Sequence, residues 1–351
     1  MEEQLEKLLK TAIEEGASDL HLSVGASPIL RLARELTPLT DYSKLSAEDT
    51  QRLIFSLLDS DQRERLKVNK NLDFSFTYGD ARFRVNAYYS TGSLAAAFRR
   101  IPLEVPGLEE LHLPDILKEF CELPQGFVLV TGPAGQGKST TIAAMLNKIA
   151  RERALHIITI EDPIEYMFEN QRALVNQREM HEDALDWGLA LRTVLREDPD
   201  VVFVGEMRDY ETISSAVTIA ETGHLVFSTL HTNSAAQTVN RIIDVFPEEE
   251  QKQIQTQLST TLEAVVSQRL VPAIGGGLYP ACEILLSSPG IRNIIREGNT
   301  HQIDNVISTS LEQGMVSLER SLARLVKEGK VERDVARRHT LKPQEFDRLL
   351  K

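Results

Sequence analysis

The first hundred residues alternate apolar and polar positions over short runs. Residues 1–16 place leucine and alanine three and four positions apart, which predicts an amphipathic helix that ends at Gly16. A second helix is expected to begin at Ser46, where Asp49 three residues later completes a weak capping box. Five other runs have the composition and period of half-buried strands: "SDLHLSV", "PILRL", "NLDFSFTY", "ARFRVNAYY" and "SLAAAFRRI". Residues 1–100 are therefore predicted to form a small α+β domain with an antiparallel sheet.

The pattern changes after a proline-rich stretch. Residues 101–117 contain Pro102, Pro106 and Pro114, which indicates an extended linker. Beyond it, four short runs are continuously apolar and each is followed by a helical stretch: "GFVLVTG", "HIITIED", "DVVFVGE" and "LVFSTLHT". Continuous runs are typical of strands buried on both faces, so we expect a mainly parallel α/β sheet covered by helices. We place this core at 118–275, with the chain mainly helical from about 247 and a C-terminal helical region at 276–351.

Composition narrows the class of protein further. The net charge of −13 argues against a broad nucleic-acid-binding surface, because phosphate contacts depend on lysine and arginine, and no nucleic-acid partner is expected. Cys121 and Cys282 are too few and too far apart for a disulfide framework or a zinc site. No apolar run approaches the roughly 20 residues that span a bilayer, and the charged N-terminus is unlike a signal peptide. We expect a globular protein of the cytosol.

One loop carries a specific chemical signal. Residues 132–139 match GxxxxGK[ST] and lie between a predicted strand and a predicted helix. Glycines let backbone N–H groups face phosphates, Lys138 reaches the outer phosphates, and the Ser139 hydroxyl ligates Mg²⁺. We favour ATP over GTP, because "NKNL" at 69–72 is not the base-reading NKxD motif of GTPases. The expected contact residues, called the phosphate loop from here on, are Gly132, Pro133, Ala134, Gly135, Gln136, Gly137, Lys138, Ser139 and Thr140.

Acidic residues follow two of the predicted strands. Glu206 ends the strand "DVVFVGE", which we expect beside the phosphate-loop strand, where a carboxylate can orient or deprotonate water. Glu161, Asp162 and Glu165 follow "IITI" and can form a shell around Mg²⁺, with Glu161 as a ligand directly or through water. The alternative is that these acids are only solvated strand ends.

Two histidines flank the predicted strand "LVFSTL". A ring nitrogen of His224 or His231 can sense the outermost phosphate if this strand lies beside the loop, although a histidine can also simply cap a strand end. A histidine metal site is not expected, since no other ligand set has suitable spacing.

Four segments together resemble the secretion ATPase superfamily and, within it, the pilus retraction ATPases of twitching motility. They are "GPAGQGKSTT", "IITIEDPIEY", "LREDPDVVFVGEMRDYETISSAVTIAETGHLVFSTLHTNSA" and "IRNIIREG". In that family these are the Walker A loop, the Asp box, the Walker B and His boxes, and a C-terminal motif. The resemblance extends over about residues 18–331.

The resemblance implies a fold, an activity and partners. The implied fold is a PAS-like N-terminal domain, a RecA-like ATPase domain and C-terminal helices, with ATP between the two domains. The implied protein is a homohexamer that hydrolyses ATP to drive pilus retraction. Its implied partner is a platform protein of the inner membrane, and only through that partner would it associate with the cytoplasmic face of that membrane.

The resemblance also implies roles for single residues. Glu206 resembles the catalytic glutamate, and Glu161 and Glu165 resemble the acids of the Asp box. His231 resembles the histidine that contacts the region of the γ-phosphate.

Arginines of the N-terminal domain complete the site in this family. The chain offers four of them, in "RFRVN" and "FRRIP": Arg82, Arg84, Arg99 and Arg100. We favour Arg84 and Arg99, with solvation of a strand face as the alternative. The chain departs from the family at Ala33–Arg34, where a Gly-Asp or Gly-Glu turn is usual, and at Gln136, where serine is common.

Two other functions remain open at this point. Assembly ATPases of pilus extension or type II secretion usually have an extra N-terminal domain and a four-cysteine zinc element, whereas this chain enters the small domain almost directly and has two cysteines. A nucleotide-binding regulator without turnover is the other alternative. Glu206 and the Asp-box acids argue against it.

Overall fold

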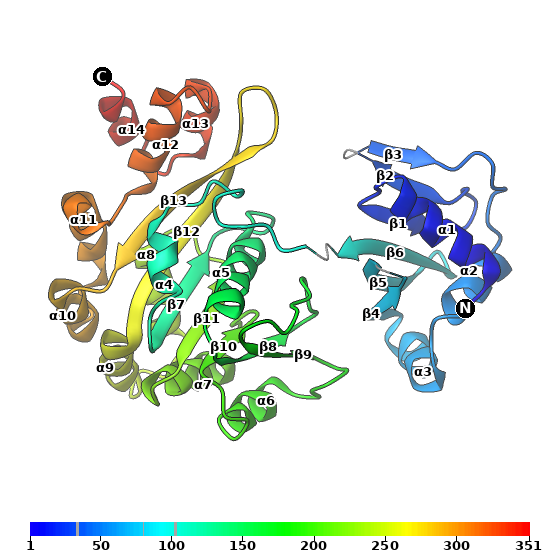
Figure 1. The fold of residues 1–351 in the computed structure, drawn as a ribbon, viewed down its shortest axis with the longest axis horizontal. Coiled ribbons are helices and arrows are strands. Elements are labelled where there is room, and N and C mark those ends of the chain that lie inside the picture. The colour runs from blue at the N-terminus through cyan, green and yellow to red at the C-terminus, as the bar shows by residue number, and fades with distance from the viewer. Residues whose placement is uncertain (33–34, 80, 102–103) are drawn as a thin grey trace. The chain divides into compact units, whose positions relative to one another are not determined.

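The computed structural model describes residues 1–32, 35–79, 81–101 and 104–351 and divides into two compact units (Figure 1). The first unit is Met1–Glu104 with Glu165–Met167, and the second is Val105–Ile164 with Phe168–Lys351. Each unit has its own sheet and its own hydrophobic core. The departure at Ala33–Arg34 and the prolyl residue Pro102 lie outside the described residues.

The first unit contains an antiparallel sheet in the order β3-β2-β1-β6-β5-β4. The five predicted strands are present, so the predicted α+β character of this part is confirmed. The strands are β1 (Asp19–Leu22), β2 (Ile29–Leu32), β3 (Glu35–Pro38), β4 (Asn71–Tyr78), β5 (Ala81–Ser90) and β6 (Ser93–Ile101).

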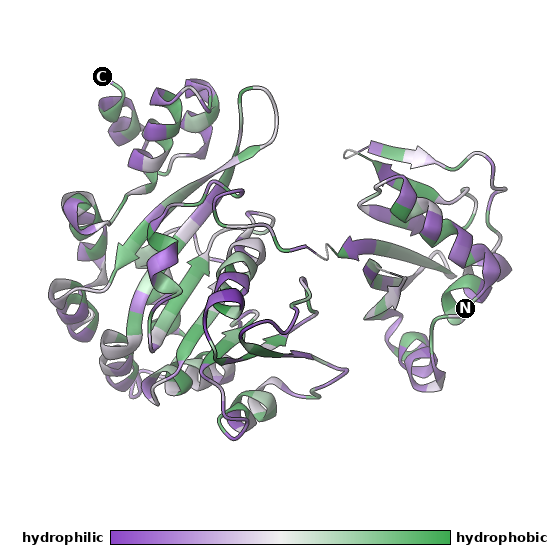
Figure 2. Ribbon diagram, viewed as in Figure 1, coloured by the Kyte–Doolittle hydropathy of each residue, from purple (hydrophilic) through white to green (hydrophobic). Residues whose placement is uncertain are grey.

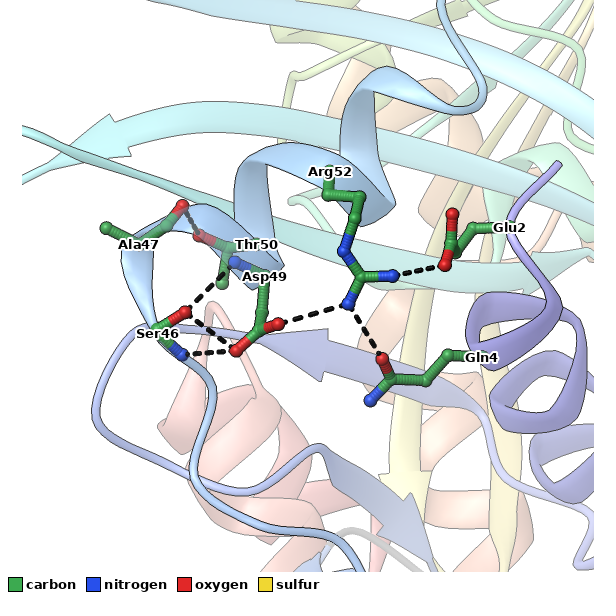
Figure 3. Close-up of polar contacts among 7 residues, drawn as sticks. All are labelled: Glu2, Gln4, Ser46, Ala47, Asp49, Thr50 and Arg52. Atoms are coloured by element: carbon green, nitrogen blue, oxygen red, sulfur yellow. Dashed lines mark hydrogen bonds and ion pairs between the residues drawn. The ribbon is translucent and has the colours of Figure 1, made fainter.

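Two helices of this unit begin where the sequence indicated. Helix α1 (Glu3–Glu14) buries its apolar face, and α2 (Ala47–Phe55) begins with the predicted capping box between Ser46 and Asp49. Figure 3 shows that Arg52 of α2 contacts Asp49 and also reaches the start of α1, where it meets Glu2 and Gln4. The guanidinium therefore ties the two helices together over the sheet.

Two short elements of the first unit were not predicted. Strand β3 has four exposed residues, so it has no apolar face that alternation could reveal. Helix α3 (Ser60–Asn69) buries one residue, Leu66, and therefore lacks an apolar stripe. Backbone pairing with β2 holds β3, and a capping box begins α3. A hydrophobic pattern reveals neither interaction.

The second unit contains a sheet in the order β13-β12-β7-β11-β10-β8-β9. All its pairings are parallel except that of β12 with β13, which confirms the predicted α/β class. Hydrophobic residues run along the central strands in Figure 2, and β7, β10 and β11 are buried throughout. The strands are β7 (Gly126–Thr131), β8 (His156–Glu161), β9 (Leu174–Glu179), β10 (Val201–Val204), β11 (Leu225–Leu230), β12 (Leu262–Pro272) and β13 (Leu278–Leu286).

Helices cover both faces of this sheet. One face is packed by α4 (Ile116–Phe120) and α5 (Lys138–Glu152). The other face is packed by α6 (Trp187–Val194), α7 (Tyr210–Glu221), α8 (Ala235–Asp244) and α9 (Gln251–Thr261). The chain ends in short helices: α10 (Pro289–Glu297), η1 (Thr300–Gln302), α11 (Ile303–Thr309), η2 (Leu311–Gln313), α12 (Leu318–Lys327), α13 (Arg333–His339) and α14 (Pro343–Leu349). None of the helices in the described ranges combines the length and apolar character that a bilayer crossing requires.

The chain from about residue 247 is mainly helical, as expected, but the strands β12 and β13 in this region were not predicted. Strands β12 and β13 form an antiparallel hairpin, with Ala264 opposite Leu286 and Pro272 opposite Leu278. The boundary expected at 275 falls in the turn of this hairpin. The polar run Ser267 to Arg269 interrupts the apolar pattern of β12, although Ser267 and Gln268 are buried there.

Candidate functional site

The phosphate loop connects the end of β7 with the start of α5. Its backbone lies against β12: a Cβ atom built on Gly132 would be 2.4 Å from the carbonyl oxygen of Gln268, so this position accepts only glycine. Gly137 precedes the helix in the left-handed region, with φ of 76°, which glycine adopts without strain. The loop therefore delivers backbone N–H groups at a helix N-terminus, which is a favourable place for phosphate.

Lys138 folds back over this loop. Its Nζ donates hydrogen bonds to the carbonyl oxygens of Gly132 at 2.9 Å and Pro133 at 3.0 Å, and the residue is 7% exposed. Ser139 and Thr140 follow in the first turn of α5. The ammonium group is thus directed toward the loop rather than into solvent, as phosphate binding requires.

The other predicted chemical groups of the second unit lie at the same edge of the sheet. Thr131 is level with Leu230 in the parallel register, Ser228 with Val204, and Val204 with Ile160. The residues that follow these strands, including Gly132, His231, Glu206 and Glu161, therefore share the carboxyl edge, where open α/β sheets bind ligands. We expected the Glu206 strand, β10, directly beside the phosphate-loop strand, and this was wrong. Strand β11 pairs with both and lies between them.

Glu206 makes a contact with each of its carboxylate oxygens. Oε1 lies 3.3 Å from Nε2 of His231, and Oε2 accepts a hydrogen bond of 2.8 Å from Nη2 of Arg208. The hydrogen bond to Glu206 is the main reason that the pKa of Arg208 is raised. Arg208 was not predicted as a site residue, although it stands two residues beyond Glu206 in the same segment.

Glu161 is buried at the end of β8. Its Oε1 accepts hydrogen bonds from Thr159 Oγ1 at 2.7 Å and from Gln177 Nε2 at 3.2 Å. These donors satisfy one carboxylate oxygen in a buried position, so Glu161 is not simply a solvated strand end. Glu165, the second acid carried over from the family, is grouped with the first unit.

The two histidines next to β11 lie at opposite ends of the strand. His231 follows the strand and contacts Glu206, whereas His224 precedes the strand, at the opposite edge of the sheet. The Nδ1 atom of His224 lies 3.1 Å from Thr222 Oγ1 and 3.1 Å from the Ile219 carbonyl oxygen. The His224 side chain therefore contacts the end of α7, away from the phosphate loop.

The candidate arginines belong to the first unit. Arg84 and Arg99 are cross-strand partners in β5 and β6, on the sheet face opposite the core residue Phe83. Nε of Arg99 donates a 3.0 Å hydrogen bond to the buried Asp19, and most of the Arg99 side chain stays exposed. Arg100 is paired with Phe83 and so lies on the other face. The register thus brings together the two arginines that the sequence analysis favoured.

Among the described residues, no group of three or more histidine, cysteine or acidic side chains is placed to hold a metal ion. Oxygen donors for Mg²⁺ are nevertheless present, in the Ser139 hydroxyl and the Glu161 carboxylate. Mg²⁺ at phosphate sites usually keeps several waters and binds one or two protein groups together with phosphate oxygens. The donor set therefore fits an ion carried in with a nucleotide.

Known proteins were compared with the chain as a whole. The profile of the type II/IV secretion system protein family matches residues 1–284. The chain belongs to this family. It is 46% identical over 341 residues to the type IV pilus retraction ATPase PilT of Pseudomonas aeruginosa, covering 97% of this chain and 99% of that protein. It is also 46% identical over 314 residues to a twitching motility protein of Neisseria gonorrhoeae, covering 89% and 84%.

A solved structure of this secretion family supports the same assignment. The crystal structure of the pilus retraction motor PilT with bound ADP matches this chain with a TM-score of 0.92, at 46% identity and over 98% of each chain. The family resemblance and the fold class predicted from the sequence are thereby confirmed.

Proposed function

We propose that this chain is an ATPase motor that hydrolyses ATP to drive the retraction of type IV pili. The observation that carries the proposal is the contact of Glu206 with His231 and Arg208 at the sheet edge that also holds the phosphate loop. Family membership and the similarity to PilT proteins over nearly the whole chain support the same activity.

The phosphate loop binds the nucleotide in this proposal. Backbone N–H groups of residues 134–137 and of the start of α5 hold the phosphates, while Lys138 neutralises the outer ones. The Ser139 hydroxyl holds Mg²⁺, and Glu161 holds it directly or through water. When bound, the ion supplies positive charge to the phosphate oxygens.

Glu206 acts on the attacking water. Its carboxylate accepts the proton from the water as the water oxygen bonds to the γ-phosphorus, which is the role of a general base. The bond from that phosphorus to the β–γ bridging oxygen breaks, and ADP leaves with the bond's electron pair. The His231 ring and the Arg208 guanidinium fix the orientation of the carboxylate. Without these two neighbours the Glu206 side chain would sample several rotamers, and fewer of them would face the water.

Arg84 and Arg99 supply positive charge from the first unit. Both lie on one sheet face, and Asp19 holds Nε of Arg99 while most of that side chain stays exposed. Arginines suit this role because the planar guanidinium binds phosphate oxygens through paired hydrogen bonds.

The segment that transmits movement to the partner in this proposal is helix α10 of the second unit. Helix α10 buries Ile291, Ile294 and Ile295, which lie three and four positions apart, and it exposes Arg296. We infer that this helix passes the ATP-driven movement to a platform protein at the cytoplasmic face of the inner membrane. The chain would act as a homohexamer and reach the membrane through that partner alone.

Counting surface pili in a deletion strain tests this function. If the chain drives retraction, the deletion strain should have an excess of immobile pili and no twitching. A plasmid copy of the natural gene should restore a normal number of pili and twitching. A copy with Glu206→Gln should fail to restore them although the protein is present in equal amount. Cells that lack pili altogether would instead assign the chain to pilus assembly.

A further inference from the structure

A cluster of polar contacts beneath the phosphate loop is not used by the proposed chemistry. Its centre is Gln268 of β12, which is 2% exposed. The Nε2 atom of Gln268 donates a 2.7 Å hydrogen bond to the carbonyl oxygen of Gln136. Its Oε1 accepts a 2.7 Å hydrogen bond from Oγ1 of Thr141. One side-chain amide therefore joins the loop to the first turn of α5.

A second bond fastens the same loop residue. Oε1 of Gln136 accepts a 2.7 Å hydrogen bond from the backbone N–H of Leu270, two residues further along β12. Serine, which is common at this position in the family, has a side chain too short by two carbon atoms to make this bond. Gln136 is thus held to β12 through both its side chain and its backbone.

The direction of the bond from Gln268 determines which way the peptide faces. The 136–137 peptide is trans, so its C=O and N–H point in opposite directions. Because the C=O faces Gln268, the N–H of Gly137 faces away from Gln268, toward the opposite side of the loop. Without that bond the peptide can rotate, since Gly137 permits a wide range of φ. A rotated peptide would present a carbonyl oxygen, instead of an N–H donor, to the phosphates.

We infer that Gln268 and Gln136 are positioning residues that hold the phosphate loop with its N–H groups aligned for phosphate. This inference rests on the proposed function, in which the loop binds the nucleotide. The two residues act before binding occurs, because they restrict a glycine-rich loop to the conformation that binds phosphate. Without them the nucleotide would have to order the loop, and the cost of that ordering would lower its affinity. Gln268 holds the loop from β12, and Gln136 is the loop residue that it holds.

The test measures ADP affinity by calorimetry on the full chain with Gln268→Met. Methionine has a similar volume but neither of the two bonds, so we expect binding to weaken about tenfold, the equivalent of one net hydrogen bond. The rise in melting temperature caused by a fixed ADP concentration should shrink to match. Thr141→Val is the matched control, because it removes the bond to α5 and keeps the bond to Gln136. Its ADP affinity should stay within about twofold of the natural protein.

Two further variants keep the outcomes distinct. Gln136→Ser removes the bond to Leu270 without disturbing the buried strand, and we expect a loss of about threefold to tenfold in ADP affinity. It tests the inference even if Gln268→Met does not fold. Natural affinity in both glutamine variants, or equal losses in Gln268→Met and Thr141→Val, overturns the inference. Lys138→Ala tests the site itself: if this variant also binds ADP normally, the proposed nucleotide site is wrong.

Discussion

Nε2 of His231 lies 3.3 Å from Oε1 of Glu206 and so joins the carboxyl ends of two neighbouring strands, β11 and β10. The other oxygen of the same carboxylate accepts a hydrogen bond from Arg208. Because both oxygens have partners, the carboxylate is fixed in one orientation at the edge of the sheet. In the proposed mechanism, this arrangement positions the Glu206 carboxylate as the base.

Replacement of the histidine tests that positioning. His231→Ala should lower kcat for ATP hydrolysis by about 10- to 100-fold, because Glu206 loses one of the contacts that orient it. ADP affinity should change little. His224→Ala is the matched control, since His224 lies at the opposite end of the same strand and contacts α7, and its kcat should stay within about twofold. Equal effects of the two substitutions would contradict the assigned role.

The arginines of the first unit permit a face-specific test. Arg99→Ala should reduce ATP hydrolysis by about 10-fold or more without unfolding the protein, because a charge directed at the nucleotide is lost. Arg100→Ala is the matched control, because Arg100 is the next residue along the strand and lies on the other sheet face. It should leave the rate of ATP hydrolysis nearly unchanged. Steady-state ATPase assays, with circular dichroism to verify folding, decide between these outcomes. A folded and fully active Arg84→Ala, Arg99→Ala double variant would remove the pair from the site.

The two arginines of α10 have different roles. Arg292 donates hydrogen bonds to the carbonyl oxygens of Ser259 and Thr260 and pairs with Glu263, so Arg292→Ala should lower the free energy of unfolding by about 1–3 kcal/mol. Arg296 is exposed, and its side chain reaches Asn293 within the same helix. Arg296→Ala should therefore keep folding and ATP hydrolysis but abolish twitching.

Chemical denaturation and a twitching assay on the same two variants separate stability from output. The spacing of four alone predicts that Arg292 and Arg296 project together, but Arg292 is held by carbonyl oxygens at the end of α9. Normal twitching with Arg296→Ala would show that this helix is an ordinary surface helix.

Buried Glu283 makes stability depend on pH. Burial raises its pKa to about 7, while the hydrogen bond from the Ala235 N–H acts in the opposite direction. Since the raised pKa means that the folded state binds the extra proton, the free energy of unfolding should fall as pH rises from about 4.5 to about 7, and then level off. Glu283→Gln keeps an acceptor for Ala235 and loses the charge. It should be more stable than the natural protein at pH 8, by on the order of 1–3 kcal/mol. An identical pH dependence of urea unfolding in both proteins would contradict this.

Local patterns predicted the phosphate loop and most strands because each is determined by nearby residues. Gly132, Gly137 and Lys138 lie within seven positions, so their spacing alone reports the loop conformation. Buried strands such as β7 and β11 are continuously apolar, which also is a local property. The strand order was not a local property: the Glu206 strand was expected beside β7, whereas β11 lies between them.

Other features depend on contacts that no local pattern contains. Gln268 lies 132 positions beyond Gln136 in the chain, and in the sequence it only interrupts an apolar run. Arg208 was missed because its role depends on the direction its side chain takes after the strand ends. Strand β3 has no buried face, so only its backbone pairing with β2 defines it.

The assembly state follows from the proposed function and is measured separately. We expect a hexamer by analytical ultracentrifugation with nucleotide present and protein in excess. A strict monomer under all nucleotide conditions would contradict the proposed ring.

The catalytic role of Glu206 is tested most directly by comparing ATP turnover with ATP binding in Glu206→Gln. The amide keeps the size of the side chain and contacts to Arg208 and His231 but cannot take a proton from water. We predict that ATP affinity stays within about threefold while the rate of phosphate release falls by roughly 10²–10⁴-fold, the usual effect of removing a positioned general base. Turnover near the natural rate in a Glu206→Gln protein that binds ATP normally would contradict the assignment of Glu206 as the base.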